Sequence, residues 1–221
     1  MKMKKLSMIL ACVMMAAFLG GCGASFDAAG YISAILDNSY KNDSSKFISM
    51  KIGTAEEAAE TYEEGLSSEV DTLIDISGAG PASDEQRAQV EAIMKDIYAK
   101  TKYTVDGAEK QDDGSYVVTV TYEQINVFGP AIEAYIADVE SLEEELLNAT
   151  EMPSEDELME RLMTSYIDSF NNALANVTYD APATATIKVL VKDQLWQPDS
   201  ADVLAFETSL FDIEELNNLF E

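Results

Sequence analysis

The sequence has no histidine among its 221 residues. Without an imidazole, the histidine-assisted serine and cysteine mechanisms are excluded, and so are the usual zinc sites. Neither a phosphate-binding P-loop nor the Gly-x-Gly-x-x-Gly pattern of dinucleotide sites occurs. Paired carboxylates therefore remain the main route to acid–base catalysis.

Basic residues are also scarce. Lysine and arginine number 14 against 41 aspartates and glutamates, which gives a formal net charge of −27. So acidic a chain would be repelled by nucleic acid and by anionic membrane surfaces. The same charge favours cationic partners, although solubility alone also explains it.

Only two cysteines occur, and both lie near the start of the chain. Three lysines in the first five residues precede an uncharged, mostly apolar stretch over residues 6–19. A helix that spans a bilayer needs about 20 apolar residues, so this stretch is too short. A basic start, a short apolar middle and small residues at the end are typical of a secretory signal peptide, predicted here over residues 1–21.

The end of this signal, Leu19-Gly20-Gly21-Cys22, resembles the lipobox of bacterial lipoproteins. The resemblance implies that the Cys22 thiol receives a diacylglyceryl group and that the chain is cut just before it. Lipid attachment at Cys22, with no other cofactor, would anchor the protein outside the cytoplasm, at the cell membrane. Cys12 leaves with the signal, so no disulfide forms. The alternative is an ordinary cleaved signal with a chance cysteine.

Periodic apolar residues predict five long helices after residue 22. The stretch 26–40 forms the first, and three later helices begin with capping boxes, Thr54/Glu57, Ser83/Gln86 and Ser154/Glu157. A fifth begins at Pro130, a residue suited to a first helical turn. The apolar faces predicted for the five helices, in chain order, are Tyr31, Ile32, Ile35 and Leu36; Ala59, Tyr62, Leu66, Val70 and Leu73; Val90, Ile93, Met94 and Ile97; Ile132, Tyr135, Ile136, Val139, Leu142 and Leu146; and Leu158, Leu162, Tyr166, Phe170, Leu174 and Val177.

Two alternating segments predict two β-hairpins. The first turns at residues 111–114 and places Tyr116, Val118, Val120 and Tyr122 on one face. The second turns at Lys192-Asp193, with Ile187, Val189 and Val191 on one face, and Pro198 closes its last strand. A short helix or two would follow to the end. The sum is an α+β fold: an antiparallel sheet of about four strands, packed against several amphipathic helices, in a single domain over residues 22–221.

Three groups of residues are candidates for a binding site. Glu56, Glu60 and Glu64 recur every fourth residue, as do Glu140 and Glu144, and hard cations prefer such oxygen ligands. We interpret these rows as solvated faces and predict no metal site. Tyr116 and Tyr122 could line a groove and Trp196 could form a platform for a ligand, but we expect all three to belong to the core.

The whole mature chain is similar to a group of uncharacterised small lipoproteins of Gram-positive bacteria. The similarity rests on FDAAGYISAILDNSYKND after the anchor, on KYTV and QDDGSYVVTVTYEQ in the first hairpin, and on LWQPD in the second. It implies a surface lipoprotein and brings no catalytic residues with it. A leading helix followed by bent hairpins also loosely resembles the cystatin-like cone of nuclear-transport-factor-2-like domains, although here the strands are fewer and the helices longer.

These observations predict a membrane-anchored binding or accessory module that is not an enzyme. Its partner would be a protein or a cell-wall component, and not nucleic acid. Two alternatives remain open: a small-ligand receptor component of a transporter, which would need two lobes around a cleft, and a hydrolase that uses carboxylates alone, which would need a buried carboxyl pair.

Overall fold

The computed structural model describes residues 17–18 and 26–213, in which helices and strands alternate in blocks. The helices are α1 (Ala28–Lys41), α2 (Ser45–Ser49), α3 (Ala55–Ser77), α4 (Asp84–Ala99), α5 (Phe128–Leu147), α6 (Glu155–Ala175) and α7 (Ser200–Leu210). The strands are β1 (Ala17–Phe18), β2 (Lys102–Lys110), β3 (Tyr116–Glu123), β4 (Ile125–Asn126), β5 (Thr178–Tyr179), β6 (Ala183–Lys192) and β7 (Leu195–Pro198).

The main sheet is antiparallel, with the strand order β1-β7-β6-β3-β2. It contains both predicted hairpins, β2–β3 and β6–β7, which β3 and β6 join through seven residue pairs. β1 contributes only two pairs to its edge and lies inside the predicted signal. Cleavage before Cys22 would leave a sheet of four strands. The α+β class and the antiparallel sheet of about four strands are confirmed, because β2, β3, β6 and β7 make up nearly all of the sheet.

The two hairpin turns form because their residues can take left-handed backbone angles. Gly114 ends the β2–β3 turn with a φ of 86°, a conformation that glycine adopts without steric cost. Asp193 and Gln194 connect β6 to β7 with φ values of 52° and 66°. Two successive positive φ angles match the twist of a two-residue hairpin. The turn lies one residue later than the predicted Lys192-Asp193, because Lys192 still pairs with Leu195 in the ladder.

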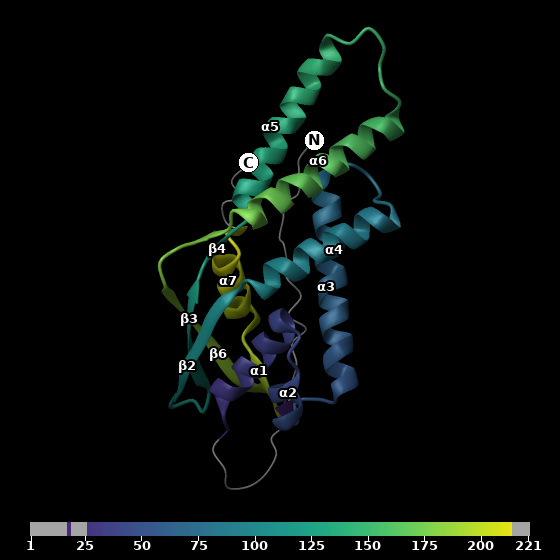
Figure 1. The fold of residues 1–221 in the computed structure, drawn as a ribbon. Helices are drawn as coiled ribbons and strands as arrows, with labels where there is room; N and C mark the ends of the chain where they lie inside the picture. The colour runs from purple at the N-terminus through teal and green to yellow at the C-terminus, as the bar shows by residue number, and fades with distance from the viewer. Residues whose placement is uncertain (1–16, 19–25, 214–221) are drawn as a thin grey trace.

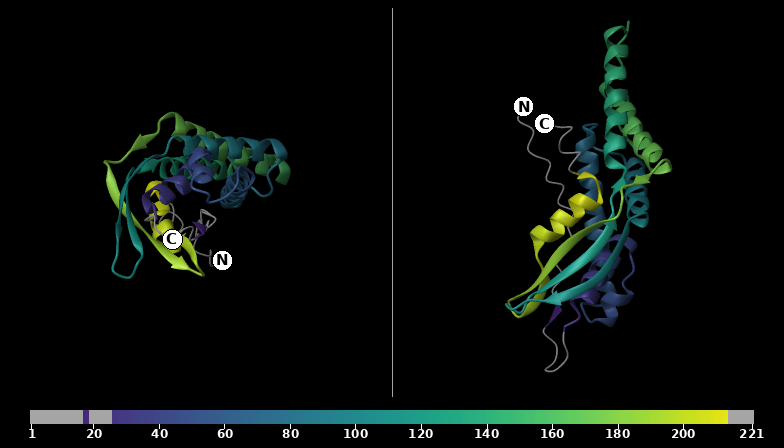
Figure 2. Two further views of the ribbon diagram at one scale, coloured as in Figure 1. Left: turned by 90° about the horizontal axis from the view of Figure 1, so that it is seen from below. Right: turned by 90° about the vertical axis from the view of Figure 1, so that its left-hand side faces the viewer.

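One face of the sheet is covered by α1 and α7, and the other is open to solvent (Figure 2). The covered face carries Tyr116, Val118 and Val120 of β3 beside Ile187 and Val189 of β6, all buried. The residues that alternate with them on the open face are half-buried or exposed: Val117, Thr119, Thr121, Thr186, Lys188 and Leu190. The alternation of apolar and polar residues in β3 thus decided which face was buried.

The helices form because their apolar faces are buried and their ends are capped. All three predicted capping boxes are present, at the starts of α3, α4 and α6, and each contributes about 1 kcal/mol. Most buried apolar side chains belong to one cluster that runs through the sheet and six of the helices, and a three-residue group lies under α2. Among the described residues, no helix has both the length and the hydropathy needed to cross a bilayer.

The structure corrects several predicted details. Ala58, not Ala59, is buried on α3, and Val191 is 48% exposed although Val189, on the same predicted face, is buried. The fifth predicted helix begins at Phe128, two residues before Pro130, and the helix predicted to Val177 ends at Ala175. The sequence pattern did not indicate α2 or the small β4–β5 pair, because each is too short to show a period.

Candidate functional site

The predicted lipid-attachment site, Leu19, Gly20, Gly21 and Cys22, lies outside the described residues. The glutamate rows, Glu56, Glu60 and Glu64 and then Glu140 and Glu144, are exposed on α3 and α5. Across residues 17–18 and 26–213, no three potential metal ligands of the histidine, cysteine or carboxylate type gather in one place. Like charges spaced four residues apart on a helix are tolerated here because water solvates them.

Tyr116 and Trp196 belong to the core, as predicted, whereas Tyr122 is half-buried and packs against it. Tyr116 is 8% exposed and Trp196 is 9% exposed. Trp196 stacks on Phe26 with ring centroids 4.3 Å apart, and Tyr122 packs edge-on against Phe206 of α7. With their rings covered by other side chains, these residues offer no open platform to a ligand.

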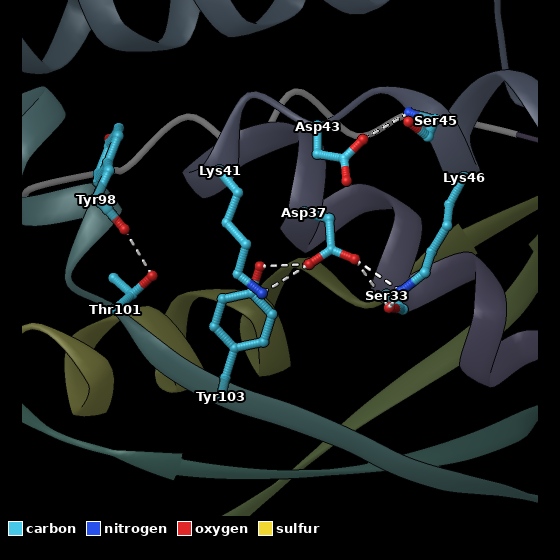
Figure 3. Close-up of polar contacts among 9 residues, drawn as sticks. All are labelled: Ser33, Asp37, Lys41, Asp43, Ser45, Lys46, Tyr98, Thr101 and Tyr103. Atoms are coloured by element: carbon cyan, nitrogen blue, oxygen red, sulfur yellow. Dashed lines mark hydrogen bonds and ion pairs between the residues drawn. The ribbon is translucent and has the colours of Figure 1, made fainter.

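A polar cluster centres on Asp37 in α1 (Figure 3). Its carboxylate accepts hydrogen bonds from Lys46 Nζ at 2.8 Å, Lys41 Nζ at 3.0 Å, the Tyr103 hydroxyl at 2.9 Å and the Ser33 hydroxyl at 3.2 Å. Lys41 Nζ also lies 4.1 Å from the centre of the Tyr103 ring. The cluster ties α1 to α2 through Lys46 and to β2 through Tyr103.

The environment of Asp37 keeps its carboxyl group ionised. Burial raises its pKa, but hydrogen bonds from Lys46, Lys41 and Tyr103 outweigh burial and lower the pKa to about 2. The Asp37 side chain is only 10% exposed, whereas those of Lys41 and Lys46 are 44% and 54% exposed. The buried carboxylate thus holds two ammonium groups near the surface in defined positions.

The contact between Lys46 and Ser33 bears on catalysis. Lys46 Nζ lies 2.6 Å from Ser33 Oγ, the separation expected of a serine nucleophile with a lysine base. Such a base must be a neutral amine, which requires burial away from anions. Lys46 is half-exposed and paired with the Asp37 carboxylate, so it lacks the burial that this role requires, and its Nζ donates a hydrogen bond to Ser33 Oγ. The cluster is suited to holding α1, α2 and β2 together.

Three other carboxylates are buried, Glu69, Glu207 and Asp212, and the last two join elements that are far apart in the sequence. Glu207 of α7 is 2% exposed and accepts a hydrogen bond from the Tyr40 hydroxyl at 2.9 Å. Asp212 is 1% exposed and accepts from the backbone amides of Phe128 and Gly129, at 3.3 and 2.9 Å. Asp212 therefore caps the start of α5, where a negative charge is favoured by the helix dipole.

Helices α5 and α6 form an arm that projects beyond the rest of the molecule (Figures 1 and 2). We call residues 128–175 the arm and residues 147–152 its tip. At its base, Tyr135 donates a hydrogen bond to the Ser77 carbonyl at 2.6 Å and packs edge-on against Tyr166. Farther out, Arg161 binds both oxygens of Glu145, at 3.2 and 2.7 Å, and joins the two helices.

The arm combines strong negative charge with exposed apolar side chains. It contains 12 acidic residues and one basic residue, Arg161, which gives it a net charge of −11. At its tip, Leu147 is 85% exposed and Met152 is 70% exposed, the two highest values among the exposed large hydrophobic residues of the described chain. Large apolar side chains held away from the core are a common feature of binding surfaces.

Sequence reasoning did not identify these features as sites. The spacing Ser33, Asp37, Lys41 is an i, i+4 series on one helix, so part of the Asp37 cluster could have been found from it. Lys46 and Tyr103 reach Asp37 only through the fold. The arm could have been suspected from the 12 acidic residues in two consecutive helices and their connection. Comparison of the chain with known proteins found no matching family model, no matching curated protein and no matching solved structure.

Proposed function

We propose that the protein is a lipid-anchored, non-enzymatic binding module at the outer face of the cytoplasmic membrane, with the α5–α6 arm as its binding element. The Leu-Gly-Gly-Cys sequence supports the anchor at Cys22. The observation that carries the binding role is the tip of the arm, where Leu147 and Met152 are exposed among carboxylates, away from the core.

The chemistry of the tip favours a partner that is basic and partly apolar. Burial of a leucine or methionine side chain contributes about 1.5–3 kcal/mol, so covering both residues would supply a useful part of a binding free energy. The carboxylates around them would attract positive charge and speed encounter with a basic partner. Anionic partners would be repelled by the net charge of −11 on the arm.

The structure gives less support to the two alternatives. A transporter receptor closes two lobes around a cleft, whereas most of the buried apolar residues described here belong to one cluster. A hydrolase would need a buried carboxyl pair that faces substrate. Asp37, Glu207 and Asp212 instead bind lysines, a tyrosine hydroxyl and backbone amides.

The anchor is tested by labelling cells with a radioactive fatty acid. The wild-type protein should carry the label and Cys22→Ala should carry none. An unlabelled wild-type protein, or equal label on both, would end the lipoprotein proposal.

The binding role of the arm is tested by photo-crosslinking on intact cells. A photoreactive residue is placed at Leu147 and, as a matched control, at Leu204, an exposed leucine on α7 with 38% exposure. The Leu147 position should yield a discrete protein adduct and Leu204 should not. Equal adducts from both positions, or none from Leu147, would contradict the assignment of the arm.

A further inference from the structure

Phe26 is the point at which the lipid tether would enter the folded body. Only residues 23–25 separate it from Cys22, and a fully extended chain of four residues spans at most about 14 Å. Phe26 itself is held in place: its ring stacks on Trp196 at 4.3 Å and contacts Tyr31 and Tyr116 at 5.4 and 5.8 Å. The anchor therefore determines which end of the body lies close to the bilayer.

This end carries both hairpin turns and α2. Tyr116 is the first residue of β3 and Trp196 lies in β7, so the β2–β3 and β6–β7 turns are at the same end of the sheet as Phe26. Figure 1 places α2 at this end too and the tip of the arm at the opposite end. We call this end the anchor end.

The anchor end has exposed apolar residues next to lysines. Ile48 of α2 is 41% exposed and lies between Lys46 and Lys51 in the sequence. Val191 of β6 is 48% exposed and is followed by Lys192 at the turn. An apolar side chain flanked by lysines suits the bilayer interface, because the apolar group enters the headgroup region while the ammonium groups bind lipid phosphates.

Charge separates the two ends of the molecule. The segments that make up the anchor end, residues 26–57, 110–115 and 188–194, contain six basic and eight acidic residues, a net charge of −2. The arm has a net charge of −11. An anionic bilayer would repel the arm far more strongly than the anchor end, within a screening distance of about 8 Å at physiological salt.

We propose that the anchor end rests on the anionic phospholipid surface, with Ile48 and Val191 at the interface and Lys46, Lys51 and Lys192 on the headgroups. The arm then points away from the membrane and presents its tip to partners. This inference rests on the proposed lipid anchor at Cys22 and adds an orientation to it.

The mature chain suits a labelling experiment, because it contains no cysteine other than Cys22, whose sulfur the lipid would occupy. The lipidated protein is reconstituted on vesicles of phosphatidylcholine and phosphatidylglycerol that contain nitroxide-labelled lipid. A fluorophore is attached in turn to Ile48→Cys, Val191→Cys, Leu147→Cys and Leu204→Cys. The four positions are all exposed, and they sample the anchor end, the arm and α7.

Fluorescence at positions 48 and 191 should be quenched strongly, and fluorescence at 147 and 204 weakly. Quenching at 147 equal to that at 48 would overturn the orientation while leaving the anchor intact. If the lipidated protein floated with vesicles no better than Cys22→Ala, both the anchor and the orientation would be overturned.

The role of the lysines is tested separately with Lys51→Glu, since Lys51 forms no ion pair with any residue that the structure describes. Each lysine near an anionic surface changes membrane binding about fivefold. On vesicles that contain phosphatidylglycerol, the fluorophore at position 48 should therefore be quenched several-fold less in the Lys51→Glu variant than in its parent. Lys100→Glu, after α4 at the far end of β2, is the matched control and should have no effect. Equal effects of the two substitutions would refute a specific lysine contact.

Discussion

Replacement of Asp37 by asparagine tests the Asp37 cluster most directly. The substitution keeps the size of the side chain and removes its charge, so Lys41 and Lys46 lose their common partner. The pKa of Asp37 falls from 3.8 to about 2 in the folded protein, and each unit corresponds to about 1.4 kcal/mol. The two lysines are half-exposed and solvent screens them, so we expect a loss of roughly 1–2 kcal/mol at pH 7.

The pH dependence gives this prediction its sign. Because the folded pKa is below the unfolded pKa, the unfolded state takes up protons first as the pH falls. The stabilisation is therefore complete above about pH 5 and is lost as the pH falls from 4 towards 2. Urea denaturation can be followed by the fluorescence of Trp196, the only tryptophan. The difference in unfolding free energy between wild type and Asp37→Asn should become smaller over that pH range.

A double-mutant cycle with Lys46→Met separates the ion pair from other effects of the substitution. At pH 7 the coupling between Asp37 and Lys46 should be about 1 kcal/mol. Lys51→Met, in the same region but without a contact to Asp37, is the control and should give a coupling near zero. A difference in unfolding free energy that stays constant from pH 7 to pH 2 would refute the reasoning. Equal coupling of Lys46 and Lys51 to Asp37 would refute it as well.

Three further substitutions test the packing and capping of the fold. Tyr166→Phe removes a buried hydroxyl that has no hydrogen-bond partner among the described residues. Calorimetry should therefore show a melting temperature that is unchanged or raised by about 2–4 °C. A clear decrease would reveal a missed partner. Phe26→Ala uncovers the stacked ring of Trp196. It should lower the free energy of unfolding by roughly 1–3 kcal/mol and shift tryptophan emission to the red. An unshifted spectrum would show that Phe26 does not shield that ring. Ser154→Ala removes the cap of α6 and should cost about 1 kcal/mol in urea denaturation, whereas Ser200→Ala, at the exposed start of α7, should cost much less.

Features that depend on neighbouring residues could be predicted from the sequence. A capping box joins residues three positions apart, and this is why Thr54, Ser83 and Ser154 identified three helix starts. The alternation in β3 and the turn residues beside it likewise defined a hairpin and its buried face. These patterns sufficed for the α+β class, because capping hydrogen bonds and the spacing of buried residues both involve residues that are close together in the sequence.

Tertiary structure decided how these elements meet. Tyr103 contacts Asp37 across 66 positions, Asp212 caps α5 across 83 and 84 positions, and Glu207 binds Tyr40 across 167. No spacing rule connects residues so far apart, because the fold brings them together only after many other contacts form. For the same reason the sequence predicted amphipathic helices at 130–146 and 154–177 but not that the outer half of the arm projects from the body. Periodicity shows that a helix has an apolar face, while only packing shows whether anything covers its far end.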